Sequence, residues 1–227
     1  MLRFWKLFIL LPIVVGHARA AGPKVHTVGL GAVKRVPYVA ADVAREDKSD
    51  EAGTLRVRPL IVDTKLKEWT TGEMHEVTDR SFVVRRVLHV NDMLPGEKVQ
   101  RWVWQPGPWL LVDRITGRVS ALHLPDFDAS VSEVAWYRDY AAYCGVKTTV
   151  RSGGLTAEVW QIGGRKAALQ KMIGKWPQEE RVRPVCETAV WQREPMRVTF
   201  QPHGGAAMGY DIVGTSAALV EEGDEEQ

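Results

Sequence analysis

Apolar residues occur along most of this chain in short runs or at every second position, a pattern typical of β-strands. β-Branched and aromatic residues are frequent in these runs, and Gly, Pro, Asp and Asn separate them. The one stretch with a helical pattern, Lys166 to Ile173, is short and poorly capped. We therefore predict a mainly β fold, an antiparallel meander of hairpins. Its expected strands cover residues 55–62, 82–90, 99–104, 109–112, 119–124, 140–146 and 157–162.

Residues 1–20 have the three parts of a secretory signal peptide. Arg3 and Lys6 come first, an apolar run follows over residues 7–15, and Ala18-Arg19-Ala20 matches the small-x-small cleavage pattern. The run is too short for a retained anchor, because a helix needs about 20 residues to cross a bilayer. No later stretch reaches that length. We therefore expect a periplasmic or secreted protein without a transmembrane segment.

The rest of the chain divides into three parts. Residues 21–54 combine short valine-rich pieces with a charged stretch, and they predict an N-terminal arm and a linker. The arm could add an edge strand or stay loose. Residues 55–213 hold the strand patterns and predict a single β domain. Residues 214–227 turn small and then acidic, which predicts a disordered tail.

Net charge changes once the signal is removed. The whole chain has 30 Lys and Arg against 28 Asp and Glu, a formal charge of +2. Without residues 1–20 the charge is −1, and without the five carboxylates of residues 221–227 the remaining body is at +4. An exported chain that is close to neutral makes nucleic acid an improbable partner.

Cys144 and Cys186 are the two cysteines of the chain. An even number of cysteines in an exported protein predicts a disulfide. Closing a loop of about 42 residues stabilises a fold by roughly 3 to 4 kcal/mol. Two buried free thiols are the alternative, and the further ligands of a zinc site are missing. We expect neither a metal nor a cofactor.

An internal repeat sharpens the β prediction. Residues 109–122 align with residues 156–169, with Gly117 opposite Gly164. Both copies have the pattern of a hairpin whose glycine supplies a positive φ at the turn. A second unit, a Trp followed by a turn and a strand, starts at Trp104, Trp136 and Trp191.

Two segments resemble known repeat proteins. Residues 134–143, Val-Ala-Trp-Tyr-Arg-Asp-Tyr-Ala-Ala-Tyr, are similar to the Trp-Ser-Pro-Asp-Gly blade motif of periplasmic WD40-like propellers. Residues 110–119, Leu-Leu-Val-Asp-Arg-Ile-Thr-Gly-Arg-Val, resemble the Asp-x-x-Thr-Gly-x-Val hairpin of these propellers and their quinoprotein-like relatives. Tyr-Arg replaces Ser-Pro, and Tyr140 replaces the blade glycine.

The resemblance implies propeller-like blades over residues 99–173 only. A partial propeller, a two-sheet sandwich or a small barrel would use the same hairpins. The run Trp-Tyr-Arg-Asp-Tyr-Ala-Ala-Tyr-Cys-Gly also resembles a group of secreted bacterial proteins. That second resemblance implies no particular function.

Tryptophans and arginines are the candidate binding residues. Exposed tryptophans offer a flat apolar face and an N–H donor, which suit sugar rings and peptide side chains. Trp104 and Trp136 belong to the repeated unit and are expected in the core, which leaves Trp102 and Trp109 as candidates. Arg56 and Arg58 share one face of a strand and predict a basic binding surface.

Carboxylates are the candidates for a catalytic alternative. Asp126 and Asp128 follow His123 in a predicted loop, and Asp139 lies in the next turn. A pair of them could act as acid and base in glycoside hydrolysis, if their carboxyl groups lay roughly 5 to 10 Å apart in a cleft lined by Trp. Loop aspartates more often cap turns. No nucleophile elbow and no phosphate loop is present.

We therefore expect an exported, non-enzymatic binding module of the cell envelope, with a protein or a polysaccharide as its partner. An extracytoplasmic hydrolase of the glycosidase type is the alternative.

Overall fold

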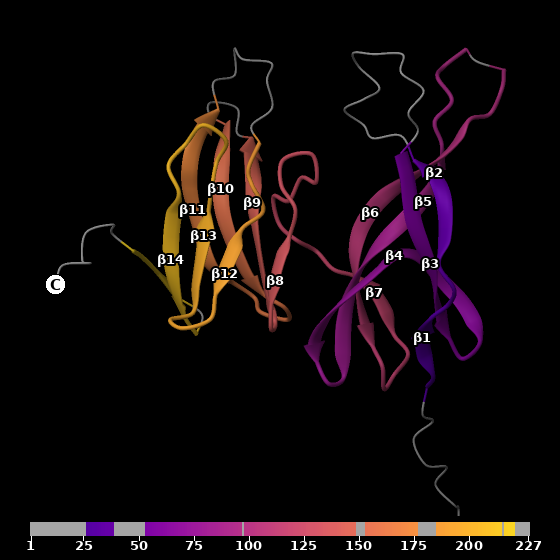
Figure 1. The fold of residues 1–227 in the computed structure, drawn as a ribbon, viewed down its shortest axis with the longest axis horizontal. Helices are drawn as coiled ribbons and strands as arrows, with labels where there is room; N and C mark the ends of the chain where they lie inside the picture. The colour runs from indigo at the N-terminus through magenta and orange to yellow at the C-terminus, as the bar shows by residue number, and fades with distance from the viewer. Residues whose placement is uncertain are drawn as a thin grey trace, which may run out of the picture.

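The computed structural model describes residues 26–38, 53–96, 98–148, 153–176, 185–214 and 216–220. The expected signal peptide, most of the charged linker and residues 221–227 lie outside these ranges. Every regular element in the described part is a strand, and most strand pairs are antiparallel (Figure 1). The predicted mainly β fold is therefore confirmed.

The first half of the chain forms a seven-stranded sheet that closes into a small barrel. Strands β3, β4, β5 and β6 pair in that order, and β2 joins β6 back to β3. The closing pair is parallel and places Tyr38 beside Trp104. β1 and β7 extend the sheet at β3 and β6. The strands are β1 (Val28–Leu30), β2 (Lys34–Tyr38), β3 (Gly53–Val62), β4 (Lys65–Thr78), β5 (Ser81–Asn91), β6 (Trp102–Asp113) and β7 (Val119–Ala121).

Alternating apolar residues of the barrel strands build its core. Phe82 and Val84 on β5 pack with Leu110 and Val112 on β6, and Leu60 of β3 completes the cluster. These side chains lie two residues apart because successive strand residues point to opposite faces. Their removal from water stabilises the barrel by roughly 2 kcal/mol per side chain.

The second half of the chain forms two four-stranded antiparallel meanders packed face to face (Figure 1). Their shared core contains apolar residues of β9 and β10 on one side and of β13 and β14 on the other, which makes this half a sandwich. The first sheet holds β8 (Ala135–Tyr137), β9 (Tyr140–Thr148), β10 (Gly153–Gln161) and β11 (Ala167–Trp176). The second holds β12 (Val190–Gln192), β13 (Arg197–Phe200), β14 (Met208–Val213) and β15 (Ser216–Leu219).

Two contacts tie the sheets of the sandwich together. Cys144 of β9 forms a disulfide with Cys186, which precedes β12, and both residues are buried in the shared core. Trp191 of β12 donates its indole N–H to the carbonyl oxygen of Ala135 at 3.2 Å. The predicted disulfide is therefore confirmed, and it joins the two layers.

The repeat predicted two hairpins, and both are confirmed as β6–β7 and β10–β11. Gly117 has the expected positive φ of 62°. In the second copy the positive φ belongs to Gly163, not to Gly164. Among the Trp units, Trp136 and Trp191 precede turns as predicted, whereas Trp104 lies inside the long strand β6.

Several elements differ from the expectation. The stretch with a helical pattern is strand β11, because its backbone pairs with β10. The arm supplies β1 and β2, and β2 is the strand that closes the barrel. Strand β15 extends the second sheet past residue 213. Of the three architectures left open, the structure combines the barrel and the sandwich.

None of the described residues belongs to a helix with the length and apolar character that crossing a membrane requires.

Candidate functional site

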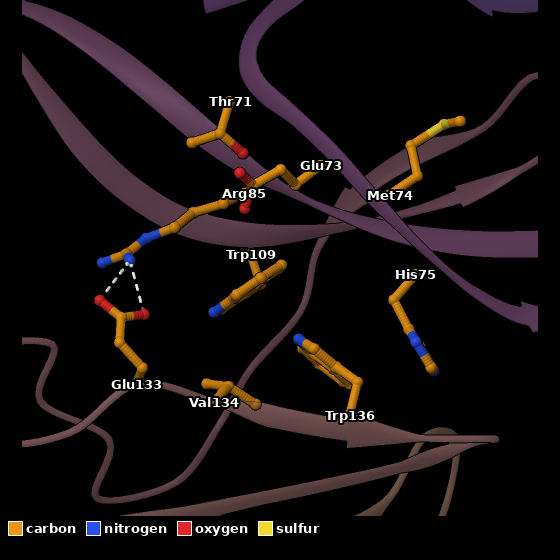
Figure 2. Close-up of a pocket in the computed structure, with 9 residues that line it drawn as sticks. All are labelled: Thr71, Glu73, Met74, His75, Arg85, Trp109, Glu133, Val134 and Trp136. Carbon is orange, nitrogen blue, oxygen red and sulfur yellow. Dashed lines mark hydrogen bonds and ion pairs between the residues drawn. The ribbon is translucent and has the colours of Figure 1, made fainter. Parts of the chain in front are cut away.

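A groove of about 460 Å³ lies where the barrel meets the first sheet of the sandwich (Figure 2). The barrel contributes side chains of β4, β5 and β6, and the sandwich contributes β8 and the loop before it. Residues far apart in sequence therefore share one site. Its central residues are His75, Arg85, Trp109, Glu133, Val134 and Trp136.

An aromatic wall forms one side of the groove. The rings of Trp109 and Trp136 meet edge to face, with centroids 5.0 Å apart. The imidazole of His75 stacks on Trp136 at 5.7 Å. Nε2 of His75 lies 2.6 Å from the carbonyl oxygen of Arg138, and it carries the hydrogen because a carbonyl can only accept. These contacts hold β4 of the barrel against the β8–β9 hairpin.

Both tryptophans of this wall have a buried indole nitrogen without an acceptor. Nε1 of Trp109 and Nε1 of Trp136 have no hydrogen-bond partner among the described residues. In Figure 2 the indole nitrogen of Trp136 lies toward Trp109, and the indole nitrogen of Trp109 lies on the side of Glu133. Buried donors are nearly always paired, and an unpaired one costs about 1 to 3 kcal/mol. Both nitrogens have almost no exposed surface, so these two donors lie beneath the lining of the groove, and a ligand can pair with them only when the lining side chains shift.

An ion pair forms the opposite rim. One terminal nitrogen of Arg85 donates to both carboxylate oxygens of Glu133, at 3.1 and 3.0 Å (Figure 2). The Arg85 side chain is only 11% exposed, whereas that of Glu133 is 55% exposed. The pair ties β5 of the barrel to the loop of residues 122–134 and places a charged group beside the apolar wall.

A second hollow of about 530 Å³ lies next to the groove. Arg85 and Trp109 line both, so these two side chains separate them. The other wall of the second hollow includes Pro106, Leu124 and Phe127. The loop of residues 122–134 thus borders both spaces. The Tyr143 hydroxyl fastens this loop to β9 by donating to the carbonyl oxygen of Pro125 at 2.6 Å.

Of the four predicted binding residues, Trp109 alone lines the groove. Trp102 begins β6 and is 53% exposed beside His89. Arg56 is exposed on β3 opposite Arg35. Arg58 donates to the carbonyl oxygens of Gly31 and Leu30, so its guanidinium holds the chain next to β1.

The predicted carboxylates are also separated. Asp126 accepts the backbone N–H of Val146 at its carbonyl, whereas Asp139 precedes Tyr140 at the other end of β9. About six residue steps of strand, or roughly 20 Å, lie between these points. Asp128 accepts the N–H and the hydroxyl of Ser130 and so caps its own turn. The structure does not bring Asp126 or Asp128 together with Asp139.

Sequence reasoning missed His75, Arg85, Glu133 and Val134, because each looks ordinary in its own segment. It also missed Glu158, a carboxylate of β10 that is fully buried. Trp160 donates its indole N–H to Oε2 of Glu158 at 3.1 Å, and Oε1 has no partner among the described residues. Burial is the main effect on this group and raises the pKa of Glu158. Glu158 is the one charged residue of this strand, and that was the available signal.

Comparison of the chain with protein family models, curated proteins and solved structures found no match.

Proposed function

We propose that this protein is an exported, non-enzymatic binding module of the cell envelope and that its ligand occupies the groove between barrel and sandwich. The observation that carries the proposal is the pair of buried indole N–H groups of Trp109 and Trp136, which lack acceptors. Binding sites commonly combine apolar walls with a few polar groups that fix orientation. Here the wall and the donors belong to the same two side chains.

The groove favours an oxygen-rich ligand. The exposed Glu133 carboxylate would accept hydroxyl or amide hydrogens, and a shift of the lining side chains on binding would let hydroxyl or carbonyl oxygens accept from the two buried indoles. The Trp136 and His75 rings supply a surface for packing against apolar ligand faces. A polysaccharide segment or an extended stretch of an envelope protein has this chemistry.

Export rests on two independent features. The disulfide between Cys144 and Cys186 fits an oxidising compartment. The tripartite pattern of residues 1–20 supports secretion through the inner membrane. Together they favour a periplasmic or secreted protein.

The hydrolase alternative has less support. Its proposed acid and base at Asp126 and Asp139 lie roughly 20 Å apart along β9, beyond the roughly 5 to 10 Å of glycosidases. Asp128 is engaged in its own turn. A binding role needs only the groove, whose residues are together.

Sedimentation with isolated peptidoglycan and affinity capture from a solubilised envelope extract would test the proposal. We expect the wild-type protein to retain a component in one of these assays. Trp109→Phe and Trp136→Phe keep an aromatic ring but remove the indole donor, so the double variant should bind at least about tenfold more weakly. Circular dichroism and thermal unfolding would verify that the variant folds.

Trp102→Phe is the matched control, since Trp102 lies outside the groove, and it should bind like the wild type. If the wild type retains nothing in either assay, the binding role is wrong. If binding survives in the double variant, the groove is not the site.

A further inference from the structure

The loop between β5 and β6 exposes an unusual set of apolar side chains. The exposed fractions are 40% for Met93, 57% for Leu94 and 78% for Val99, and Trp102 at the start of β6 is 53% exposed. In Figure 1 this loop projects beyond the end of the barrel. These apolar residues therefore belong to a protruding loop or to the strand end next to it.

The base of the loop is held by its own hydrogen bonds. The N–H of Asp92 donates to the carbonyl oxygen of Arg101 at 2.7 Å, and the N–H of Arg101 donates to Oδ1 of Asn91 at 3.1 Å. The Arg101 guanidinium also pairs with the Asp92 carboxylate at 2.9 Å. These contacts fix the stem from which the apolar residues extend.

Trp102 is supported by stacked rings. His89 lies between two indoles, 5.2 Å from Trp102 and 4.4 Å from Trp104. Trp104 in turn meets Trp69 edge to face at 5.9 Å, and Lys34 lies over Trp69 at 5.0 Å. The exposed indole is thus one end of a series of ring contacts that continues to Trp69 of β4.

We propose that this loop inserts into the surface of a lipid membrane, with Met93, Leu94 and Val99 entering the acyl boundary and Trp102 lying at the level of the head groups. Tryptophan favours that level because its ring is apolar and its N–H is polar. Lys98 follows in the same loop and is exposed, so it can face lipid phosphates.

The shape of the loop favours lipid over a protein partner. A stable protein interface usually buries more than about 1,000 Å² and anchors its central residues in pockets. A protruding tip with three or four apolar side chains is too small for that. The same tip can enter a fluid bilayer, which needs no complementary pocket.

Flotation with lipid vesicles tests the proposal. The probes are vesicles of phosphatidylcholine alone and vesicles that also contain phosphatidylglycerol. We expect the wild type to float with the vesicles, and the double variant Met93→Glu/Val99→Glu to partition at least about tenfold less. The control is Val190→Glu/Val213→Glu, which places the same charges on exposed sites of the sandwich, at 66% and 75% exposure. The apolar run of residues 7–15 is the same in all variants. Differences in vesicle binding between them therefore report on the loop.

A second readout follows Trp102 itself. Brominated lipids should quench part of the tryptophan fluorescence of the wild type and clearly less in Trp102→Phe. Three results would overturn the proposal: no flotation of the wild type with either vesicle, equal loss in the control variant, or loop-dependent binding to lipid-free envelope protein without vesicle binding. The last result would identify a protein as the occupant.

Discussion

At the scale of single residues, Glu158 is the clearest departure from ordinary strand chemistry. Its carboxyl group is fully buried beside Tyr143 and opposite Gln170, with Trp160 as its hydrogen-bond donor. Burial disfavours the charged form, and this effect outweighs the opposing hydrogen bonds and the Lys147 charge. The pKa of Glu158 is therefore higher in the folded protein than in the unfolded chain.

The raised pKa of Glu158 has a consequence for stability against pH. The folded state holds this proton more tightly, so the stabilising contribution is complete below about pH 4.5, the unfolded value. It is lost as pH rises through the folded pKa. Glu158→Gln stays neutral, so its free energy of unfolding relative to the wild type should improve as pH rises above about 4.5, until the pH passes the folded pKa of Glu158. Urea unfolding at several pH values measures this difference, and a constant difference would contradict it.

At the scale of elements, β4 shows how a polar strand is held in place. Gly72 has a φ of 82°, and a Cβ there would lie 2.4 Å from Cδ of Arg58 on the neighbouring strand β3. The Arg58 side chain cannot move away freely, because its guanidinium donates to the carbonyl oxygens of Leu30 and Gly31. Gly72 therefore lets β4, β3 and the arm pack together.

Replacing this glycine should loosen the barrel. Gly72→Ala combines backbone strain with a clash against Arg58, and we expect a loss of roughly 2 to 3 kcal/mol in the free energy of unfolding. Gly163→Ala is a matched control, since Gly163 has the same φ of 82° and no atom within 4 Å of the added Cβ. It should lose only about 1 kcal/mol. If denaturant unfolding shows the same loss of free energy for both variants, the clash with Arg58 does not contribute.

At the scale of the whole molecule, two different architectures meet along one groove. The barrel closes through its own strand pairing, and the sandwich is fastened between its layers by the Cys144–Cys186 disulfide. The groove needs both, because His75, Arg85 and Trp109 come from the barrel and Glu133 and Trp136 from the other half. Its geometry thus depends on the junction and not on either half alone.

Removing the disulfide should weaken the sandwich more than the barrel. The crosslink spans 42 residues, and loop entropy predicts that Cys144→Ala/Cys186→Ala lowers the free energy of unfolding by about 4 kcal/mol. Near-ultraviolet circular dichroism of the sandwich tryptophans, such as Trp191, would follow the change. An unchanged denaturation midpoint in the double variant would contradict this expectation.

Local pattern was sufficient for much of the fold. The alternation in β5 and β9 predicted their strands and core faces, the glycine turns predicted two hairpins, and the cysteine count predicted the disulfide. Polar β4 was not predicted, since its backbone pairs with strands on both sides whatever its side chains are. The helical pattern of β11 was likewise overridden by pairing with β10.

By itself the sequence determined the strand-forming segments, the turns and the one crosslink, because these depend on residues close together in the chain or on residue type. Only the tertiary structure decided that the hairpins form a barrel and a sandwich. It also decided that Trp109 and Trp136 face one groove while Trp102 stands at a protruding loop. The physical reason is that a site between packed elements depends on how distant strands pair and which of their faces meet. The residue pattern of one segment does not indicate which distant segment it packs against.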